Sequence, residues 1–128
     1  VILSGPPTMI PKGIEALGAS VVYNINDAIS GADVVMMLRI QKERQKSFLF
    51  PSEREYARFY GLSADKLKNA KEDVLIMHPG PLNRGVEIAP DVADGPHSII
   101  LEQVTNGVAI RMAMFYLLSG GVRNADDN

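Results

Sequence analysis

The sequence predicts a single α/β domain in which a parallel sheet is flanked by helices. Four short apolar segments, at residues 1–3, 20–23, 34–38 and 74–77, have the composition of buried strands. Helical patterns separate them, and strands that alternate with helices pair in parallel through right-handed crossovers. With 128 residues, the chain is long enough to build one hydrophobic core.

The overall composition is that of an ordinary globular domain, with 46% hydrophobic and 22% charged residues. The net charge of −2 offers no basis for a nucleic-acid or acidic-membrane surface, and no apolar run approaches the roughly 20 residues of a membrane helix. The absence of Cys excludes disulfides and Cys-ligated zinc within this chain. We therefore expect a cytoplasmic protein without nucleic-acid or membrane partners.

Short helices are predicted between the first strands. One begins near Pro11 and ends at Gly18, because proline suits the first helical turn and glycine the C-terminal cap. The next is capped by Asn24 or Asn26 and ends at Gly31. The alternation of strand and helix thus continues up to the third strand.

The third and fourth strands both end in chemically distinctive loops. Residues 34–38 are apolar throughout, which predicts a strand covered on both faces, and a polar, charged segment begins directly afterwards at Arg39. Residues 74–77 run into a loop that opens at His78 and contains two prolines, which cannot continue a central ladder. Parallel strands bring their carboxyl ends to one edge of a sheet, where ligands bind in open α/β folds. We therefore predict a shared site at these two loops.

Helices are also predicted in the second half of the chain. Ser52 and Glu55 match a capping box, so a helix begins there and ends at about Tyr60, and Ser63 caps a second short helix. Residues 89–96 have the composition of a surface loop.

The last predicted helix runs from about residue 99 to 118, with Ser98 as its cap. Its apolar residues recur at helical spacing on one face. They are Ile100, Val104, Val108, Met112 and Phe115.

Three segments resemble the aspartate carbamoyltransferase family, in the family's order and with similar spacing. They are residues 37–44 (MLRIQKER), 78–88 (HPGPLNRGVEI) and 103–111 (QVTNGVAIR). The resemblance covers most of the chain but only the family's second, aspartate-binding half. It implies that residues 1–128 form this domain, incomplete at its N-terminal edge and without the carbamoyl-phosphate domain. Because the chain opens inside an apolar strand without Met, we also expect a piece of a longer protein.

The resemblance implies two groups of substrate-binding residues. Arg39 and Gln41 would hold L-aspartate, and a guanidinium fork suits a carboxylate. Pro79, Gly80 and Pro81 would hold the carbamoyl end of carbamoyl phosphate through backbone carbonyls, with a cis peptide before Pro81. From the residues alone, a surface arginine, a solvated amide and a simple rigid turn are the alternatives.

Supporting roles are implied for two further residues. Arg44 would stabilise a closed loop through ion pairs, and Glu87 would pair with the partner domain unless it is a surface carboxylate. His78, beside an apolar strand and a proline, is predicted to be a hydrogen-bonded structural residue rather than a general base, and His97 a helix-entry residue. Two distant histidines do not make a metal site, so we expect no metal, and the reaction that the resemblance implies needs no cofactor.

The activity implied is transfer of the carbamoyl group of carbamoyl phosphate to L-aspartate. The products are N-carbamoyl-L-aspartate and phosphate, in de novo pyrimidine (UMP) biosynthesis. The main catalytic groups would lie in the other half, so this chain alone is expected to be inactive. Family partners include the N-terminal carbamoyl-phosphate domain, a homotrimer of catalytic chains, and a regulatory chain or a dihydroorotase.

Three alternatives remain. The first is ornithine carbamoyltransferase, which typically has a Cys in the loop that here reads HPGP. The second is a non-catalytic scaffold domain with the carbamoyltransferase fold. The third is an unrelated doubly wound binding domain.

Overall fold

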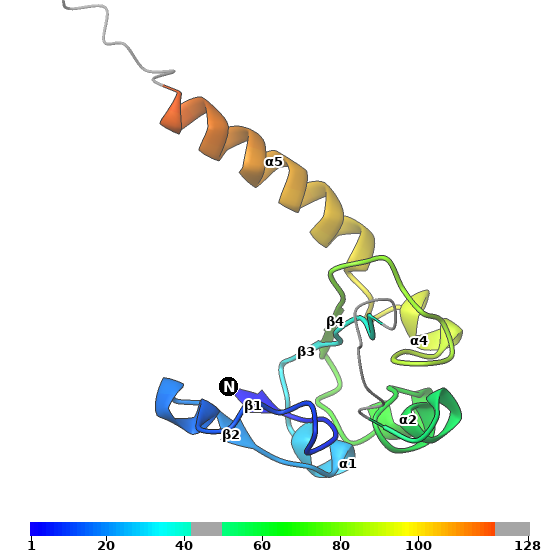
Figure 1. Cartoon of the computed structure of the whole chain (residues 1–128). Coiled ribbons are helices and arrows are strands. Elements are labelled where there is room, and N and C mark those ends of the chain that lie inside the picture. The colour runs from blue at the N-terminus through cyan, green and yellow to red at the C-terminus, as the bar shows by residue number, and fades with distance from the viewer. Residues whose placement is uncertain (42–49, 120–128) are drawn as a thin grey trace, which may run out of the picture.

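The computed structural model describes residues 1–41 and 50–119 and consists of a small α/β body from which one long helix extends (Figure 1). Parallel strands β1 (Ile2–Leu3) and β2 (Ser20–Val21) form one sheet. Parallel strands β3 (Val34–Met36) and β4 (Leu75–Met77) form another. The α/β class and the parallel pairing are confirmed.

The strands differ from the prediction in how they assemble. They form two separate two-stranded sheets rather than one, because no strand in the described ranges joins β1 to β3. Strand β3 was expected to be covered on both faces, and this is wrong within the described chain. Val35 is 7% exposed, but its neighbours Val34 and Met36 on the opposite face are 48% and 45% exposed. Alternate side chains point to opposite faces of a strand, so only one face of β3 is buried here.

The helices mostly follow the predicted segments, but the first is a short 3-10 helix that begins at Ile14 rather than near Pro11. The described helices are η1 (Ile14–Leu17), α1 (Ile25–Ala28), α2 (Glu53–Phe59), α3 (Ala64–Leu67), α4 (Pro90–Ala93) and α5 (Ile100–Leu118). Only α5 is long, and no described helix combines the length and apolar character needed to cross a membrane.

Side-chain caps determine where three helices begin. The Oγ of Ser52 accepts a hydrogen bond from the N–H of Glu55 at 3.1 Å, and Ser63 does the same for Lys66. Asn24, rather than Asn26, caps α1, since its Oδ1 accepts from the Asn26 N–H at 3.0 Å. These caps confirm the local sequence signals, because each bond spans only two or three residues.

Two local predictions are wrong. Residues 89–96 are not simply a surface loop, because they contain α4, which begins at Pro90 and buries Val92 and Ala93. Ser98 does not cap α5; Ile99 occupies that position without a side-chain hydrogen bond. The chain before α5 instead lies beside β4. The Ile76 N–H donates to the His97 carbonyl, and the Ile99 N–H donates to the Ile76 carbonyl.

The hydrophobic core lies between the buried face of β3 and β4 and the short helices. Its members come from α1, β3, β4, α4, the start of α5 and the turns between them. They are Ile25, Ile29, Val35, Met37, Leu62, Val74, Ile76, Ile88, Val92, Ala93 and Ile100.

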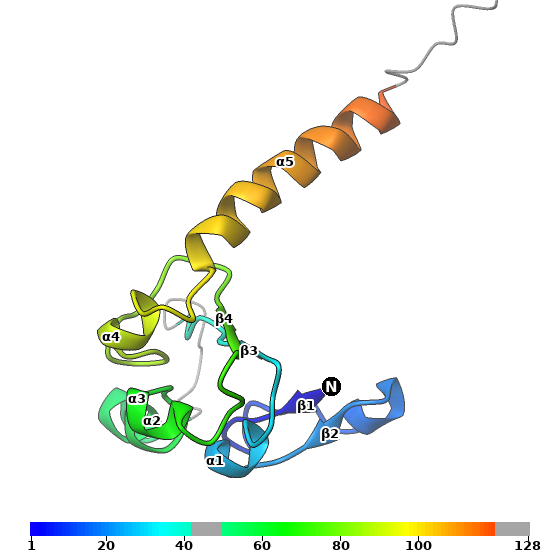
Figure 2. The same ribbon diagram turned by 180° about the vertical axis from the view of Figure 1, so that it is seen from behind.

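Helix α5 extends away from this body, as both views show (Figures 1 and 2). The predicted helix is confirmed, but its apolar face is not buried within the described chain: Val104 and Val108 are 48% exposed and Phe115 is 73% exposed. Large exposed apolar surfaces mark interaction sites in soluble proteins.

The turn between α2 and α3 packs tightly against residues 86–89. The Leu62 N–H donates to the Glu87 carbonyl at 2.9 Å, and the Ala89 N–H donates to the Leu62 carbonyl at 2.8 Å. At Gly61, a Cβ atom would lie 2.4 Å from the Val86 carbonyl oxygen. Lys66 reinforces the turn by donating to the Gly61 carbonyl at 2.7 Å. The body thus supports the loop that follows β4.

The close approach at Gly61 makes this position intolerant of a side chain. We expect Gly61→Ala to lower the free energy of unfolding by about 1–3 kcal/mol, because the clash is with backbone atoms that cannot rotate away. Urea denaturation followed by circular dichroism measures this. In the control Gly107→Ala, the new Cβ meets nothing closer than 3.8 Å, and stability should be unchanged or slightly raised. Equal effects of the two substitutions would contradict the packing described.

Candidate functional site

The ends of β3 and β4 lie side by side and send their loops to the same edge. Met36 is in register with Met77, and the Met37 N–H donates to the Met77 carbonyl at 2.9 Å. Arg39 therefore follows one strand where His78 follows the other. The predicted convergence of the two loops is confirmed.

His78 is fully buried and both of its ring nitrogens have partners. Its Nδ1 accepts a hydrogen bond from the Gly80 N–H at 2.8 Å, and its Nε2 lies 3.2 Å from Oε1 of Glu87. Because Nδ1 is an acceptor, the ring proton is on Nε2 and is donated to the carboxylate. The backbone N–H of His78 donates to Oε1 of Gln103 in α5 at 3.0 Å. His78 is thus a hydrogen-bonded structural residue, as predicted.

The surroundings of His78 favour the neutral ring. Burial lowers its pKa below the ordinary value of 6.5, and the nearby positive charge of Arg39 lowers it further, while Glu87 acts in the opposite direction. A neutral ring keeps Nδ1 available for the Gly80 N–H.

Glu87 differs from both sequence-based interpretations. Its side chain is completely buried inside this chain, so it is neither a surface carboxylate nor available to pair with a partner domain. Its carboxylate accepts from the Asn83 N–H at 2.5 Å, from Asn83 Nδ2 at 3.1 Å and from His78 Nε2 at 3.2 Å. A buried carboxylate needs such donors, because they replace the water that burial removes. Glu87 supports the loop from within.

Asn83 connects this loop to the segment after β3. Its Nδ2 donates to the Ile40 carbonyl at 3.0 Å, in addition to its bond with Glu87. Sequence reasoning missed this residue. An Asn in a polar loop is typical of a turn, and the 43 residues that separate it from Ile40 leave no local pattern to reveal the contact.

The predicted substrate-binding residues lie around this network. The Gly80–Pro81 peptide is cis, which confirms the prediction, and Gly80 has a φ of +64°. Gly80 is half-buried between exposed Pro79 and Pro81.

On the other strand end, Arg39 and Gln41 are half-buried, and the Nε of Arg39 is inaccessible to solvent. The two groups lie at the same edge. Arg44, the predicted supporting residue, is outside the described residues.

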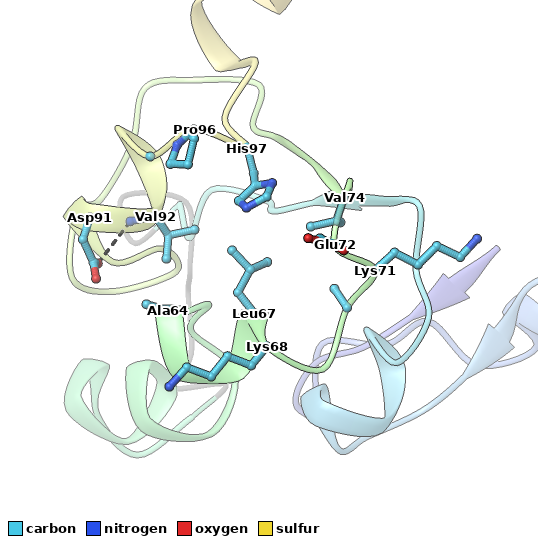
Figure 3. Close-up of a pocket in the computed structure, with 12 residues that line it drawn as sticks. Ala64, Leu67, Lys68, Lys71, Glu72, Val74, Asp91, Val92, Pro96 and His97 are labelled. Atoms are coloured by element: carbon cyan, nitrogen blue, oxygen red, sulfur yellow. Dashed lines mark hydrogen bonds between the residues drawn. The ribbon is translucent and has the colours of Figure 1, made fainter.

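A cavity of about 760 Å³ lies at the opposite end of β4 (Figure 3). Lys71 and Val74, which precede β4, contribute to its wall, and His97 points into it together with Leu67 and Val92. None of the predicted substrate-binding residues lines it. Among residues 1–41 and 50–119, no group of three or more His, Asp or Glu residues is placed to hold a metal ion.

Comparison with known proteins identifies the family. Residues 9–118 match the family model described as the Asp/Orn binding domain of aspartate/ornithine carbamoyltransferase. The chain belongs to this family. An unrelated doubly wound binding domain is thereby excluded.

Curated relatives of this carbamoyltransferase domain are similar over nearly the whole chain. The "aspartate carbamoyltransferase catalytic subunit" of Desulfosudis oleivorans is 69% identical over 99% of the chain, which corresponds to 41% of the relative. The protein of the same name from Moorella thermoacetica is 61% identical over 91% of the chain and 38% of the relative. The chain thus spans about two fifths of the length of these relatives.

Solved structures confirm the carbamoyltransferase fold. Ornithine carbamoyltransferase from Pyrococcus furiosus aligns with a TM-score of 0.77 and 24% identity, covering 96% of this chain and 42% of that one. Aspartate transcarbamoylase from Trypanosoma cruzi, in complex with carbamoyl aspartate and phosphate, aligns with a TM-score of 0.71 and 23% identity, covering 91% and 39%. At these identities the likeness shows the fold alone.

The lowered pKa of His78 predicts a pH dependence of stability for this carbamoyltransferase domain. His78 takes up a proton at about pH 6.5 in the unfolded chain, whereas in the folded chain it takes up this proton only at lower pH. The neutral His78 therefore makes its full contribution to the free energy of unfolding above pH 6.5, and this contribution is lost as the pH falls below 6.5. We expect the free energy of unfolding from urea denaturation to decrease between pH 7.5 and 5.5, and to decrease less in His78→Gln. An unchanged slope in His78→Gln would contradict the assignment.

Proposed function

We propose that this chain is the aspartate-binding domain of an aspartate carbamoyltransferase catalytic chain. The whole protein would transfer the carbamoyl group of carbamoyl phosphate to the α-amine of L-aspartate, giving N-carbamoyl-L-aspartate and phosphate for pyrimidine biosynthesis. The observation that carries the proposal is the 61–69% identity to curated proteins of that name over 91–99% of the chain.

The geometry of the two strand ends supports separate substrate-binding roles for two segments, residues 39–41 and residues 79–81. Arg39 and Gln41 would bind the carboxylates of aspartate, because a guanidinium group makes paired, charge-assisted hydrogen bonds to carboxylates. Backbone carbonyls of Pro79, Gly80 and Pro81 would accept hydrogen bonds from the carbamoyl NH₂ group. Since both segments open at one edge, the two reactants would meet there, and the contribution of this domain would be orientation of the amine toward the carbamoyl carbon.

The remaining catalytic groups would come from an N-terminal carbamoyl-phosphate domain. Two observations support this partner: the chain spans 38–41% of the length of its relatives, and α5 carries an exposed apolar face that a second domain would cover. The proposal extends to a homotrimer of catalytic chains in the cytoplasm. A regulatory chain or a dihydroorotase is a further candidate partner.

A direct competition assay distinguishes an aspartate carbamoyltransferase from an ornithine carbamoyltransferase. The full-length protein is supplied with carbamoyl phosphate and equal concentrations of L-aspartate and L-ornithine, and the products are quantified by mass spectrometry. We expect N-carbamoyl-L-aspartate from the full-length protein and none from residues 1–128 alone. Citrulline as the main product would establish an ornithine carbamoyltransferase instead. Absence of both products, with no binding of a bisubstrate analogue carrying phosphonate and aspartate groups, would establish a scaffold.

Arg39 provides a test of the proposed aspartate contacts. Each charge-assisted hydrogen bond is worth about 1.5–3 kcal/mol, so Arg39→Ala in the full-length protein should lower kcat/KM for aspartate by roughly ten- to a hundredfold or more. The KM for carbamoyl phosphate should change little, because its contacts lie on the other segment. Steady-state kinetics measure both constants. The control Arg58→Ala removes an exposed arginine on α2 and should behave as wild type; a selective loss of carbamoyl-phosphate binding in Arg39→Ala would refute the assignment.

A further inference from the structure

We infer that Asn83 is a positioning residue. It sets the placement of the aspartate-binding segment (residues 39–41) relative to the carbamoyl-binding loop (residues 79–81). This inference rests on the function proposed above. It is carried by the hydrogen bond between Asn83 and the Ile40 carbonyl, which joins two segments that are 43 residues apart in the sequence.

The amide group of Asn83 has one orientation that fits its surroundings. Its Nδ2 donates to the Ile40 carbonyl at 3.0 Å and to Oε2 of Glu87 at 3.1 Å, and an amide nitrogen has two protons to donate. Rotating the amide by 180° would turn its oxygen toward two acceptors. Both acceptors therefore hold the side chain in place, and both of its N–H groups are used.

The Ile40 carbonyl is a critical point on the aspartate-binding segment. Strand pairing holds this segment as far as Met37, whose N–H bonds to the Met77 carbonyl. Three residues further on, the Asn83 bond holds the peptide unit that links Ile40 to Gln41. Ile40 is only 3% exposed, so water is a poor substitute for this donor. Arg39 and Gln41 lie on either side of this restrained residue.

The other end of the connection reaches the carbamoyl-binding loop. Glu87 accepts from Asn83 and also from His78, whose Nδ1 in turn accepts the N–H of Gly80 at 2.8 Å. Glu87 and His78 are completely buried, and hydrogen bonds in such surroundings are stronger than in water. A continuous series of hydrogen bonds thus runs from the Ile40 carbonyl to the Gly80 amide.

The network is asymmetric, which makes the role of the Asn83 side chain testable. The backbone N–H of Asn83 also donates to Glu87, at 2.5 Å, and no side-chain substitution removes it. Truncating the side chain therefore releases Ile40 but leaves the bonds among Glu87, His78 and Gly80. The effect should fall on aspartate binding, because the released Ile40 lies between Arg39 and Gln41, the proposed aspartate contacts.

The test uses steady-state kinetics of the full-length protein carrying Asn83→Ala. We expect the KM for aspartate to rise by about tenfold or more, while the KM for carbamoyl phosphate stays within about twofold of wild type. A merely structural role would lower the unfolding midpoint and the active fraction without this split. The matched control is Arg84→Ala, which removes the neighbouring side chain and its exposed pair with Asp94 and should leave both constants unchanged.

A second variant covers the case in which Asn83→Ala does not fold. Asn83→Ser is a milder change whose hydroxyl is too short to reach both acceptors, and it should also raise the KM for aspartate selectively. If the wild type is active and the KM for aspartate is unchanged in either folded variant, the role inferred for Asn83 is overturned, and the proposed function is not. A wild-type protein that forms no N-carbamoyl-L-aspartate overturns the proposed function and this inference with it.

Discussion

The buried carboxylate of Glu87 is the constraint on which the loop after β4 depends. Removing a carboxylate from water is costly unless hydrogen-bond donors replace the lost solvent. Here the donors are the backbone and side chain of Asn83 and the ring of His78. These residues lie four and nine positions before Glu87. The hydrogen bonds to the one carboxylate therefore hold the two ends of the loop together. Gly80 is then held by the other nitrogen of the same histidine.

The rest of the body supports this loop from three directions. Strand β3 lies beside β4 and brings Arg39 to the same edge, while the turn at Gly61 and Leu62 packs against the residues around Glu87. From α5, Gln103 accepts the backbone N–H of His78. The start of α5 is therefore tied to the site, although most of the helix lies away from the body (Figure 1). A partner domain seated on α5 would contact an element that is bonded directly to the candidate site.

The same arrangement explains why His78 is unsuited to proton transfer. A general base needs a free nitrogen lone pair within reach of the substrate. In this structure Nδ1 accepts the Gly80 N–H and Nε2 donates to Glu87, and the ring has no exposed surface. What His78 provides is a stable shape for the backbone between the prolines. The chemistry proposed for this domain is accordingly the placement of two reactants by an arginine, an amide and backbone carbonyls.

The sequence alone determined the features that depend on neighbouring residues or on the general rules of parallel sheets. Ser52, Ser63 and Asn24 cap their helices through bonds that span two or three residues, and the Arg39 and His78 loops meet because parallel strands end at one edge. The cis peptide before Pro81 came from the family resemblance. Only the tertiary structure decided that Glu87 is buried, that Asn83 reaches Ile40, and that one face of β3 and most of α5 are exposed. These features depend on contacts between distant segments, and no local periodicity or composition specifies which polar side chain will find its partner across the fold.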